Sequence, residues 1–293
     1  MKSFRIFENI DKYLKYMEFV ESSSSHTIKA YALDLSQVFK SDINSYKSDL
    51  NEAEIMDAVR KAFNTWASLS LATRNRKAAT LKSFFSWSFQ EGVLEKDLSL
   101  SVTCPKVPKK IPHFISVDEA LAVIHSLENE QLLKDKTLFL LLYGGGLRIS
   151  EACNLKWSHI NISQRTLRIL GKGKKERLVT IPSLTISALQ DLQKQSQISD
   201  YVFGDKPLNQ RGAYEIIRKA GVRAQLLKPL HPHALRHSFA THLLSSGANL
   251  RILQELLGHE SLQTTEKYTH LGIDHLARTM DQLHPLGKNS KTP

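Results

Sequence analysis

The sequence has few cysteines and no apolar run long enough to cross a membrane. The spacing of Cys104 and Cys153 fits neither a disulfide framework nor a cysteine-rich zinc site. The longest apolar run, LFLLLY at 138–143, is far shorter than the roughly 18 residues that a membrane span needs. Charged residues interrupt each apolar cluster of MKSFRIFENIDKY, so no signal peptide is predicted. We therefore expect a soluble, cytoplasmic protein without a membrane partner.

Nucleotide-binding motifs and metal-binding carboxylates are also missing. Neither G-x-x-x-x-G-K-[ST] nor G-x-G-x-x-G occurs, although three glycines follow one another at 144–146. No paired carboxylates of the kind that hold Mg²⁺ accompany the candidate residues described below. The sequence therefore predicts no cofactor and no metal.

Positive charge is in excess, because 40 Lys and Arg against 29 Asp and Glu give the 293-residue chain a formal charge of +11. Such a balance favours a polyanionic partner, most often nucleic acid. A soluble protein that is merely cationic would have the same composition, so composition alone leaves both interpretations open.

Residues 1–103 have the pattern of a helical, DNA-binding domain. Two apolar stripes recur at helical spacing, the first after ESSSSHT and the second before Gly92. Basic residues occupy the other side of the second helix, and we interpret them as a surface that contacts phosphates. The stripes are Ile28, Tyr31, Leu35 and Val38, then Ala78, Leu81, Phe85 and Phe89; the basic residues are Arg74, Arg76, Lys77 and Lys82.

The segment CPKVPKKIP at 104–112 indicates a linker, because its prolines restrict the backbone and its lysines keep it hydrated. A capping box, Ser116 to Glu119, begins a helix just beyond it. Residues 113–293 are then a second, larger domain, mostly helical, with a β-hairpin in TLRILGKGKKERLVTIP at 166–182. Its tail carries an apolar stripe that needs a hydrophobic groove, its own or a neighbour's. The stripe is Ile273, Leu276, Met280 and Leu283.

The helix in HPHALRHSFATHLL at 231–244 presents two different faces. Leu235, Phe239 and Leu243 predict a core face, and a His233–Arg236 pair on another face suits an anionic oxygen. His233 and His237 have a zinc-like spacing, but the motif lacks the glutamate of H-E-x-x-H and a third ligand. An anion site is the favoured interpretation, with His237 and His242 as packing or hydrogen-bonded residues.

Three further segments add basic or nucleophilic side chains. In YGGGLRISE, Arg148 precedes a helix predicted near Ser150, and Glu151 either orients this arginine or simply begins the helix. Lys172 lies between two glycines at the hairpin tip; alone it would be one more hydrated lysine, but it can also reach a ligand. In LLGHESLQTTEKYTHLG, Gly258 ends a helix and exposes His259, and Tyr268 has polar neighbours that argue against a core position. Stacking on DNA bases remains an alternative for Tyr268.

Together these side chains suit the cleavage of a phosphodiester without a metal ion. Two arginines can neutralise the charge that develops on the phosphate oxygens, and histidines add donors and a proton acceptor. A tyrosine can attack once cationic neighbours favour its anion, and a lysine can protonate the departing sugar oxygen. Covalent attachment to tyrosine conserves a phosphoester, so the strands can be rejoined without ATP.

The motifs GGGLRISE, GKGKKERLVTIP, HALRHSFATHLL and LLGHESLQTTEKYTHL resemble the tyrosine recombinases, the phage-integrase family, and especially its bacterial Xer branch. The resemblance spans most of 115–285, and TIKAYALDLSQVF with SFFSW is similar to the family's helical core-binding domain. YTHLGIDHLA and the terminal HP are more similar to XerC than to XerD. The resemblance implies Tyr268 as the nucleophile of a 3′-phosphotyrosyl intermediate. The other catalytic residues that it implies are Arg148, Lys172, His233, Arg236 and His259.

The resemblance also implies a mainly α-helical, two-domain, C-shaped clamp on double-stranded DNA with a specific recombination site. Four protomers, identical or of two related kinds, then exchange strands through a Holliday junction, each tail lying on the adjacent subunit. The implied task is the resolution of chromosome or plasmid dimers on the nucleoid, with a DNA translocase as a candidate activator. A mobile-element integrase, a type IB topoisomerase and a non-catalytic DNA-binding protein are the alternatives.

Overall fold

The computed structural model describes residues 4–21, 25–39, 49–108, 114–170, 176–195, 199–249, 253, 256 and 270–287. The chain divides into two compact units, Met1–Lys110 and Ile111–Pro293. The division falls inside the proline- and lysine-rich segment 104–112. No helix of the described residues is both long and apolar enough to cross a membrane.

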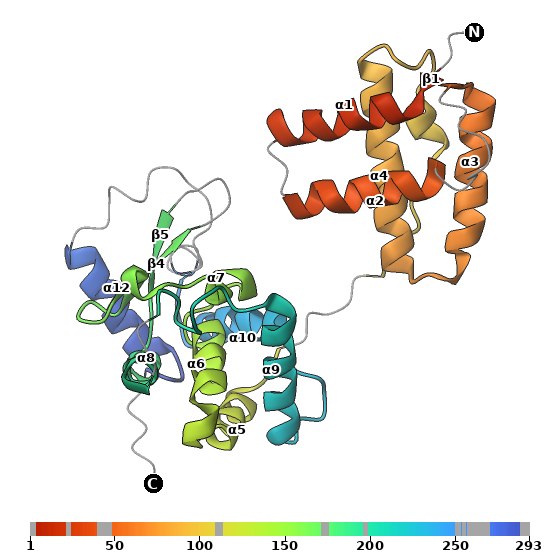
Figure 1. Cartoon of the computed structure of the whole chain (residues 1–293). Coiled ribbons are helices and arrows are strands. Elements are labelled where there is room, and N and C mark those ends of the chain that lie inside the picture. Colours follow the sequence, from red (N-terminus) through yellow and green to blue (C-terminus); the bar gives the residue numbers. More distant parts are fainter. Residues whose placement is uncertain are drawn as a thin grey trace. The chain divides into compact units, whose positions relative to one another are not determined.

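The N-terminal unit is a bundle of helices with a short two-stranded pairing at its edge (Figure 1). β1 (Phe4–Arg5) pairs antiparallel with β2 (Asp49–Leu50). The helices are α1 (Ile6–Phe19), α2 (Ser25–Phe39), α3 (Glu52–Thr65) and α4 (Leu71–Gln90), with 3-10 turns at Trp66–Ser68 and Leu98–Ser101.

The core of this unit follows the predicted stripes except at one end. Leu35 and Val38 of α2 are buried, as are Ala78, Leu81 and Phe85 of α4. Phe89 was expected to complete the stripe of α4, but its side chain is 43% exposed. Ser88 takes the buried position instead and donates a hydrogen bond to the carbonyl of Phe84. The prediction for Phe89 is therefore wrong, because the turn of the helix brings Ser88 to the core face.

The basic side of α4 is only partly a surface. Lys77 is buried, and its Nζ lies 3.0 Å from Oδ1 of the buried Asp34 and 4.9 Å from the ring centre of Trp66. Arg76 also pairs with Asp34, and Thr80 donates to the same carboxylate at 3.2 Å. The prediction of a continuous phosphate-contacting surface is wrong at Lys77, whose charge is used inside the bundle. Lys82 is exposed.

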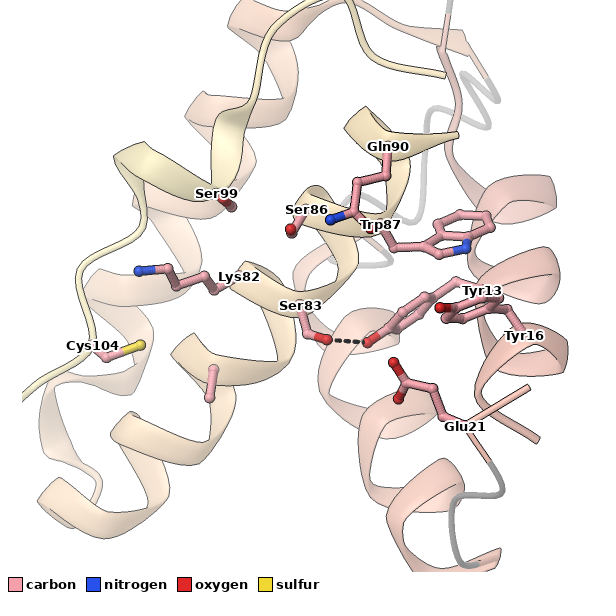
Figure 2. Close-up of a pocket in the computed structure, with 11 residues that line it drawn as sticks. Tyr13, Tyr16, Glu21, Lys82, Ser83, Ser86, Trp87, Gln90, Ser99 and Cys104 are labelled. Atoms are coloured by element: carbon pink, nitrogen blue, oxygen red, sulfur yellow. Dashed lines mark hydrogen bonds between the residues drawn. The ribbon is translucent and has the colours of Figure 1, made fainter. Parts of the chain in front are cut away.

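A groove of about 440 Å³ runs beside α1 and α4 in this unit (Figure 2). The hydroxyl of Tyr13 donates to Ser83 Oγ at 2.7 Å, and Trp87 packs against Tyr13 at 5.4 Å between ring centres. Ser86 and Lys82 lie along the same wall. The groove has a mixed lining of aromatic and polar side chains without an arginine, and it lies in a different unit from the arginine cluster described below.

The C-terminal unit surrounds one buried helix, α6 (Leu133–Tyr143), whose residues 138–143 are all inaccessible to solvent. Helices α8, α9 and α10 pack against it (Figure 1). The predicted capping box is confirmed, because Ser116 Oγ accepts from the Glu119 amide at 3.1 Å and the Glu119 carboxylate accepts from the Ser116 amide at 2.7 Å. The remaining helices are α5 (Val117–Ser126), α7 (Ile149–Cys153), α8 (Ser183–Gln195), α9 (Gln210–Arg223), α10 (Pro232–Ser245) and α12 (His270–Leu283), with 3-10 turns at Glu130–Leu132 and Trp157–His159.

A small antiparallel sheet is the exception to the helical fold, as predicted. Its order is β3 (Ile160–Asn161), β4 (Thr166–Leu170) and β5 (Glu176–Thr180). β4 and β5 pair from Thr166 opposite Thr180 to Leu170 opposite Glu176. The chain is thus mainly α-helical with a β-hairpin in the second unit.

The tail helix α12 packs on its own unit. Leu276 and Met280 are buried together with Phe239 and Leu243 of α10, and Asp281 pairs with Arg165 at 2.8 Å. The side chain of Ile273 lies outside the described residues. In this single chain the stripe therefore covers a groove of its own domain.

His284 fixes the end of this tail beneath α6. Its Nδ1 accepts from the amide of Leu286 at 3.1 Å, so Nε2 carries the proton and donates to the carbonyl of Tyr143 at 3.2 Å. The imidazole is fully buried, and burial lowers the pKa of His284 to about 3. The Tyr143 hydroxyl lies 2.8 Å from Nδ1 of His242.

Replacement of Asp34 by Ala should lower the free energy of unfolding by about 3–5 kcal/mol, because it leaves the buried Lys77 without its carboxylate. Urea unfolding followed by tryptophan fluorescence, to which Trp66 and Trp87 contribute, measures this loss. The control is Asp57→Ala, which removes an exposed pair with Lys61 and should cost about 1 kcal/mol or less. Equal losses for the two variants would contradict a stabilising role for the buried network.

Candidate active site

Helix α10 brings one predicted pair of site residues to the surface of the C-terminal unit. His231 caps the helix, because its Nδ1 accepts from the amide of Ala234 at 3.1 Å, and Pro232 begins the first turn. His233 is exposed in that first turn, and Arg236 follows one turn later. The opposite, apolar face of α10 is confirmed as core, since Leu235, Phe239 and Leu243 are fully buried.

The histidines of α10 have different environments. His242 is buried and hydrogen-bonded to Tyr143, as predicted for a packing residue, whereas His237 is exposed. Across the described ranges, no three His, Cys, Asp or Glu side chains gather as ligands for a metal ion.

The glycine loop after α6 connects the two predicted arginines. Gly146 has φ +60°, and a Cβ on it would lie 2.6 Å from a ring carbon of Phe239. Only glycine combines this left-handed backbone with such a close approach to α10. The carbonyl of Gly146 accepts a hydrogen bond from Nη1 of Arg236. The loop that leads to Arg148 is therefore held directly by the other arginine.

Arg148 is the cap residue of α7, which begins at Ile149, one residue before the predicted start. Its Nη1 donates to Oε1 of Glu151 at 2.9 Å, and its backbone amide donates to Oε2 at 2.8 Å. Both functions considered for Glu151 are thus present, since the carboxylate satisfies the helix start and holds the guanidinium. The side chain of Arg148 is 51% exposed whereas that of Glu151 is 6% exposed, so the arginine can meet a ligand.

One more arginine, missed by the sequence interpretation, completes the cluster. Arg177 of β5 forms a two-pronged pair with Glu151, with both nitrogen–oxygen distances at 2.8 Å. Strand alternation places Arg177 on the same face as the buried Val179. An arginine on the inward face of a strand needs a carboxylate partner, and this was the signal available in the sequence.

The cluster carries an excess of positive charge. Burial, together with the neighbouring charge of Arg148, lowers the pKa of Arg236 to about 10. Burial alone would raise the pKa of Glu151, but hydrogen bonds and charge from Arg177, together with Arg148, lower it below its ordinary value. Three guanidinium groups around one ionised carboxylate form a site for an anion.

The structure brings together three of the predicted features, namely Arg148, Arg236 and the exposed first turn with His233. The other predicted site residues, Lys172, His259 and Tyr268, lie outside the described residues.

Comparison with known proteins identifies the family. The model of the phage integrase family matches residues 113–275, and the model of its N-terminal SAM-like domain matches residues 10–92. The chain belongs to the phage integrase family. Within it, the chain is a tyrosine recombinase of the Xer branch and thus a site-specific recombinase.

Relatives of the Xer branch match this recombinase over nearly their whole length. A tyrosine recombinase XerC of Xanthomonas axonopodis pv. citri (strain 306) is 32% identical, over 97% of this chain and 98% of the relative. A XerC of Thermodesulfovibrio yellowstonii is 33% identical, with 96% and 98% covered. A XerD of Staphylococcus aureus (strain Mu50) is 32% identical, with 94% and 98% covered.

Solved structures of tyrosine recombinases share the fold. A lambda integrase tetramer bound to a Holliday junction has a TM-score of 0.66 at 18% identity, covering 90% of this chain and 77% of that one. The XerH recombinase in a post-cleavage complex with difH has a TM-score of 0.64 at 23% identity, covering 92% and 82%.

Replacement of Gly146 by Ala should lower the free energy of unfolding by about 2–5 kcal/mol, the sum of a left-handed backbone and an overpacked contact with Phe239. Strand cleavage should fall as well, because the loop holds Arg148. The control is Gly247→Ala in the same unit, where φ is +96° but no atom lies within 4 Å of the new Cβ, so only the backbone cost of about 1–2 kcal/mol applies. Denaturant unfolding and a cleavage assay measure both effects. Indistinguishable variants would show that the Phe239 contact does not matter.

Proposed function

We propose that Arg148, Lys172, His233, Arg236, His259 and Tyr268 form the active site of this recombinase, with Tyr268 as the nucleophile. The observation that carries the proposal is that Arg236 holds the Gly146 loop that leads to Arg148, and that the exposed His233 lies one turn before Arg236 on α10. This arrangement suits a tetrahedral anion with several exposed oxygens, such as a DNA backbone phosphate.

The reaction needs no cofactor in this proposal. The phenolic oxygen of Tyr268 attacks the scissile phosphorus, a phosphorus–oxygen bond to tyrosine forms, and the bond to the 5′-oxygen breaks. The proton of the phenol passes to a basic group, with a histidine as the candidate, and Lys172 protonates the departing 5′-oxygen. Arg148 and Arg236 stabilise the charge on the non-bridging oxygens. The product is a 3′-phosphotyrosyl link and a free 5′-hydroxyl, and the reverse reaction rejoins strands.

The proposed substrate is double-stranded DNA with a specific recombination site. The excess of positive charge and the exposed Lys82 on α4 support this assignment. Four protomers, of one or two related kinds, would act through a Holliday junction, the DNA to which the lambda integrase tetramer named above is bound. The Xer names of the relatives support the resolution of chromosome or plasmid dimers at cell division. A cytoplasmic location and a DNA translocase as activator are part of the same proposal.

The target locus separates this task from that of a mobile-element integrase with the same chemistry. Sequencing of DNA ends trapped on Tyr268 in cells gives the locus directly. Ends at one chromosomal site support dimer resolution, whereas ends beside a transposon or prophage support integration.

Replacement of Tyr268 by Phe should abolish the covalent protein–DNA adduct on a nicked suicide substrate, because the attacking oxygen is removed. Binding to the recombination site should stay within about 2-fold of wild type, a difference below about 0.5 kcal/mol. Denaturing gels detect the adduct, and the reaction is run in EDTA, which should not slow it. An adduct with the phenylalanine variant, or strong inhibition by EDTA, would rule out this chemistry.

Replacement of Arg148 or Arg236 by Ala should slow single-turnover cleavage by about 10²–10³-fold, the usual effect of losing a donor to transition-state charge. DNA affinity should fall only modestly. The matched control is Lys194→Ala, which removes one positive charge from an exposed pair with Asp191 on α8. Equal losses of binding and cleavage would assign the arginines to binding or folding instead.

A further inference from the structure

Arg177 and Glu151 form the most buried ion pair of the arginine cluster. The two terminal nitrogens of Arg177 each donate to one carboxylate oxygen, and the side chains are 13% and 6% exposed. Arg177 projects from β5, immediately after the hairpin tip, whereas Glu151 belongs to α7. The pair therefore joins the sheet to the helix that carries Arg148.

Arg177 is directed at the carboxylate and is nearly shielded from a substrate, because its side chain is only 13% exposed. Each terminal nitrogen donates one N–H to Glu151, and Nε is buried without an acceptor among the described residues. Any effect of this residue on the reaction must act through the carboxylate. This distinguishes it from Arg148, which is half exposed.

The carboxylate of Glu151 is fully shared between its neighbours. Oε1 accepts from Nη1 of both arginines, and Oε2 accepts from Nη2 of Arg177 and the backbone amide of Arg148. Arg148 consequently gives only one guanidinium hydrogen bond to Glu151. Without Arg177, the unshared carboxylate would attract the Arg148 guanidinium into a two-pronged pair and neutralise its charge.

We propose that Arg177 is a positioning residue for strand cleavage, which saturates Glu151 so that Arg148 directs its other N–H groups and its net charge to the scissile phosphate. The inference rests on the proposed function and assigns a part in it to a residue outside the six motif positions. Arg177 does not touch DNA; it determines how Glu151 holds Arg148.

The ionisation of Glu151 gives a second readout. Its charged neighbours among the described residues are Arg148 at the start of α7, Arg177 from β5 and Arg236 from α10. Removal of Arg177 takes away the strongest of the interactions that lower the pKa of Glu151 and leaves its burial, so this pKa rises. Because the ionised carboxylate also holds Arg148 in place through its backbone amide and Nη1, the cleavage rate should then be lost at a higher pH as the solution is acidified.

The experiment compares Arg177→Gln, Arg177→Lys, Glu151→Gln and the Arg177→Gln/Glu151→Gln double variant in the full-length chain. Single-turnover adduct formation on the nicked substrate and affinity for the same DNA are measured across pH. Arg177→Gln should cleave about 10–100-fold more slowly, as expected for loss of a partner that orients a site residue, with affinity nearly unchanged. Arg177→Lys, which keeps the positive charge but cannot form the two-pronged pair with Glu151, should recover part of the rate. The double variant should be no slower than Glu151→Gln alone, because both changes act on one contact.

The matched control is Arg168→Gln on the adjacent strand β4, where the side chain is 49% exposed. It removes the same charge from the same sheet and should leave rate and pH profile unchanged. The proposal is overturned if Arg177→Gln behaves like this control, if it loses affinity as much as rate, or if the double variant is additive. An unshifted acid limb would also overturn it. If Arg177→Gln does not fold, the rate and acid limb of Arg177→Lys decide the outcome. Absence of any adduct with the wild-type chain would instead contradict the proposed function.

Discussion

The active-site region depends on one carboxylate that two arginines share. Glu151 contacts the start of α7, the strand β5 through Arg177, and the proposed catalytic residue Arg148. It can remain ionised while almost buried because Arg177 and Arg148 surround it. A single buried acid thus converts a repulsive group of guanidinium ions into a stable arrangement. The remaining positive charge is what an incoming phosphate meets.

Backbone geometry complements this ion pair. The loop after α6 turns at Gly146, approaches Phe239 and offers its carbonyl to Arg236. Two of these contacts join elements distant in sequence, since Arg236 lies 90 positions from Gly146 and Arg177 lies 26 positions from Glu151. Since residues 138–143 of α6 are inaccessible to solvent, the loop has a rigid base.

Much of this architecture could be predicted from sequence because it has a local signal. The Ser116 capping box, the apolar face of α10 and the hairpin each follow from spacing within a few residues. Phe89 was placed wrongly because a small error in helical phase accumulates at the end of a helix. Lys77 was placed wrongly because its buried partner, Asp34 on α2, has no signal in the residues around Lys77. Arg177 was missed for the same reason, as its partner lies 26 positions away. Arg148 and Arg236 had only weak local signals, and resemblance to a family gave them roles that spacing alone could not.

The buried His284 gives the tail a dependence on acidity. In the folded chain its imidazole is neutral and joins the last turn of the protein to the carbonyl at the end of α6. The folded pKa of His284 is about 3, below its unfolded value of about 6.5. The stability contributed by the neutral imidazole is therefore complete above a pH of about 6.5 and declines as the pH falls towards 3. Detaching α12 would also separate the imidazole from the Phe239 ring, which supports Gly146. The tail and the loop before Arg148 thus share one packing element, the Phe239 ring, and protonation of His284 would weaken the contact on the tail side.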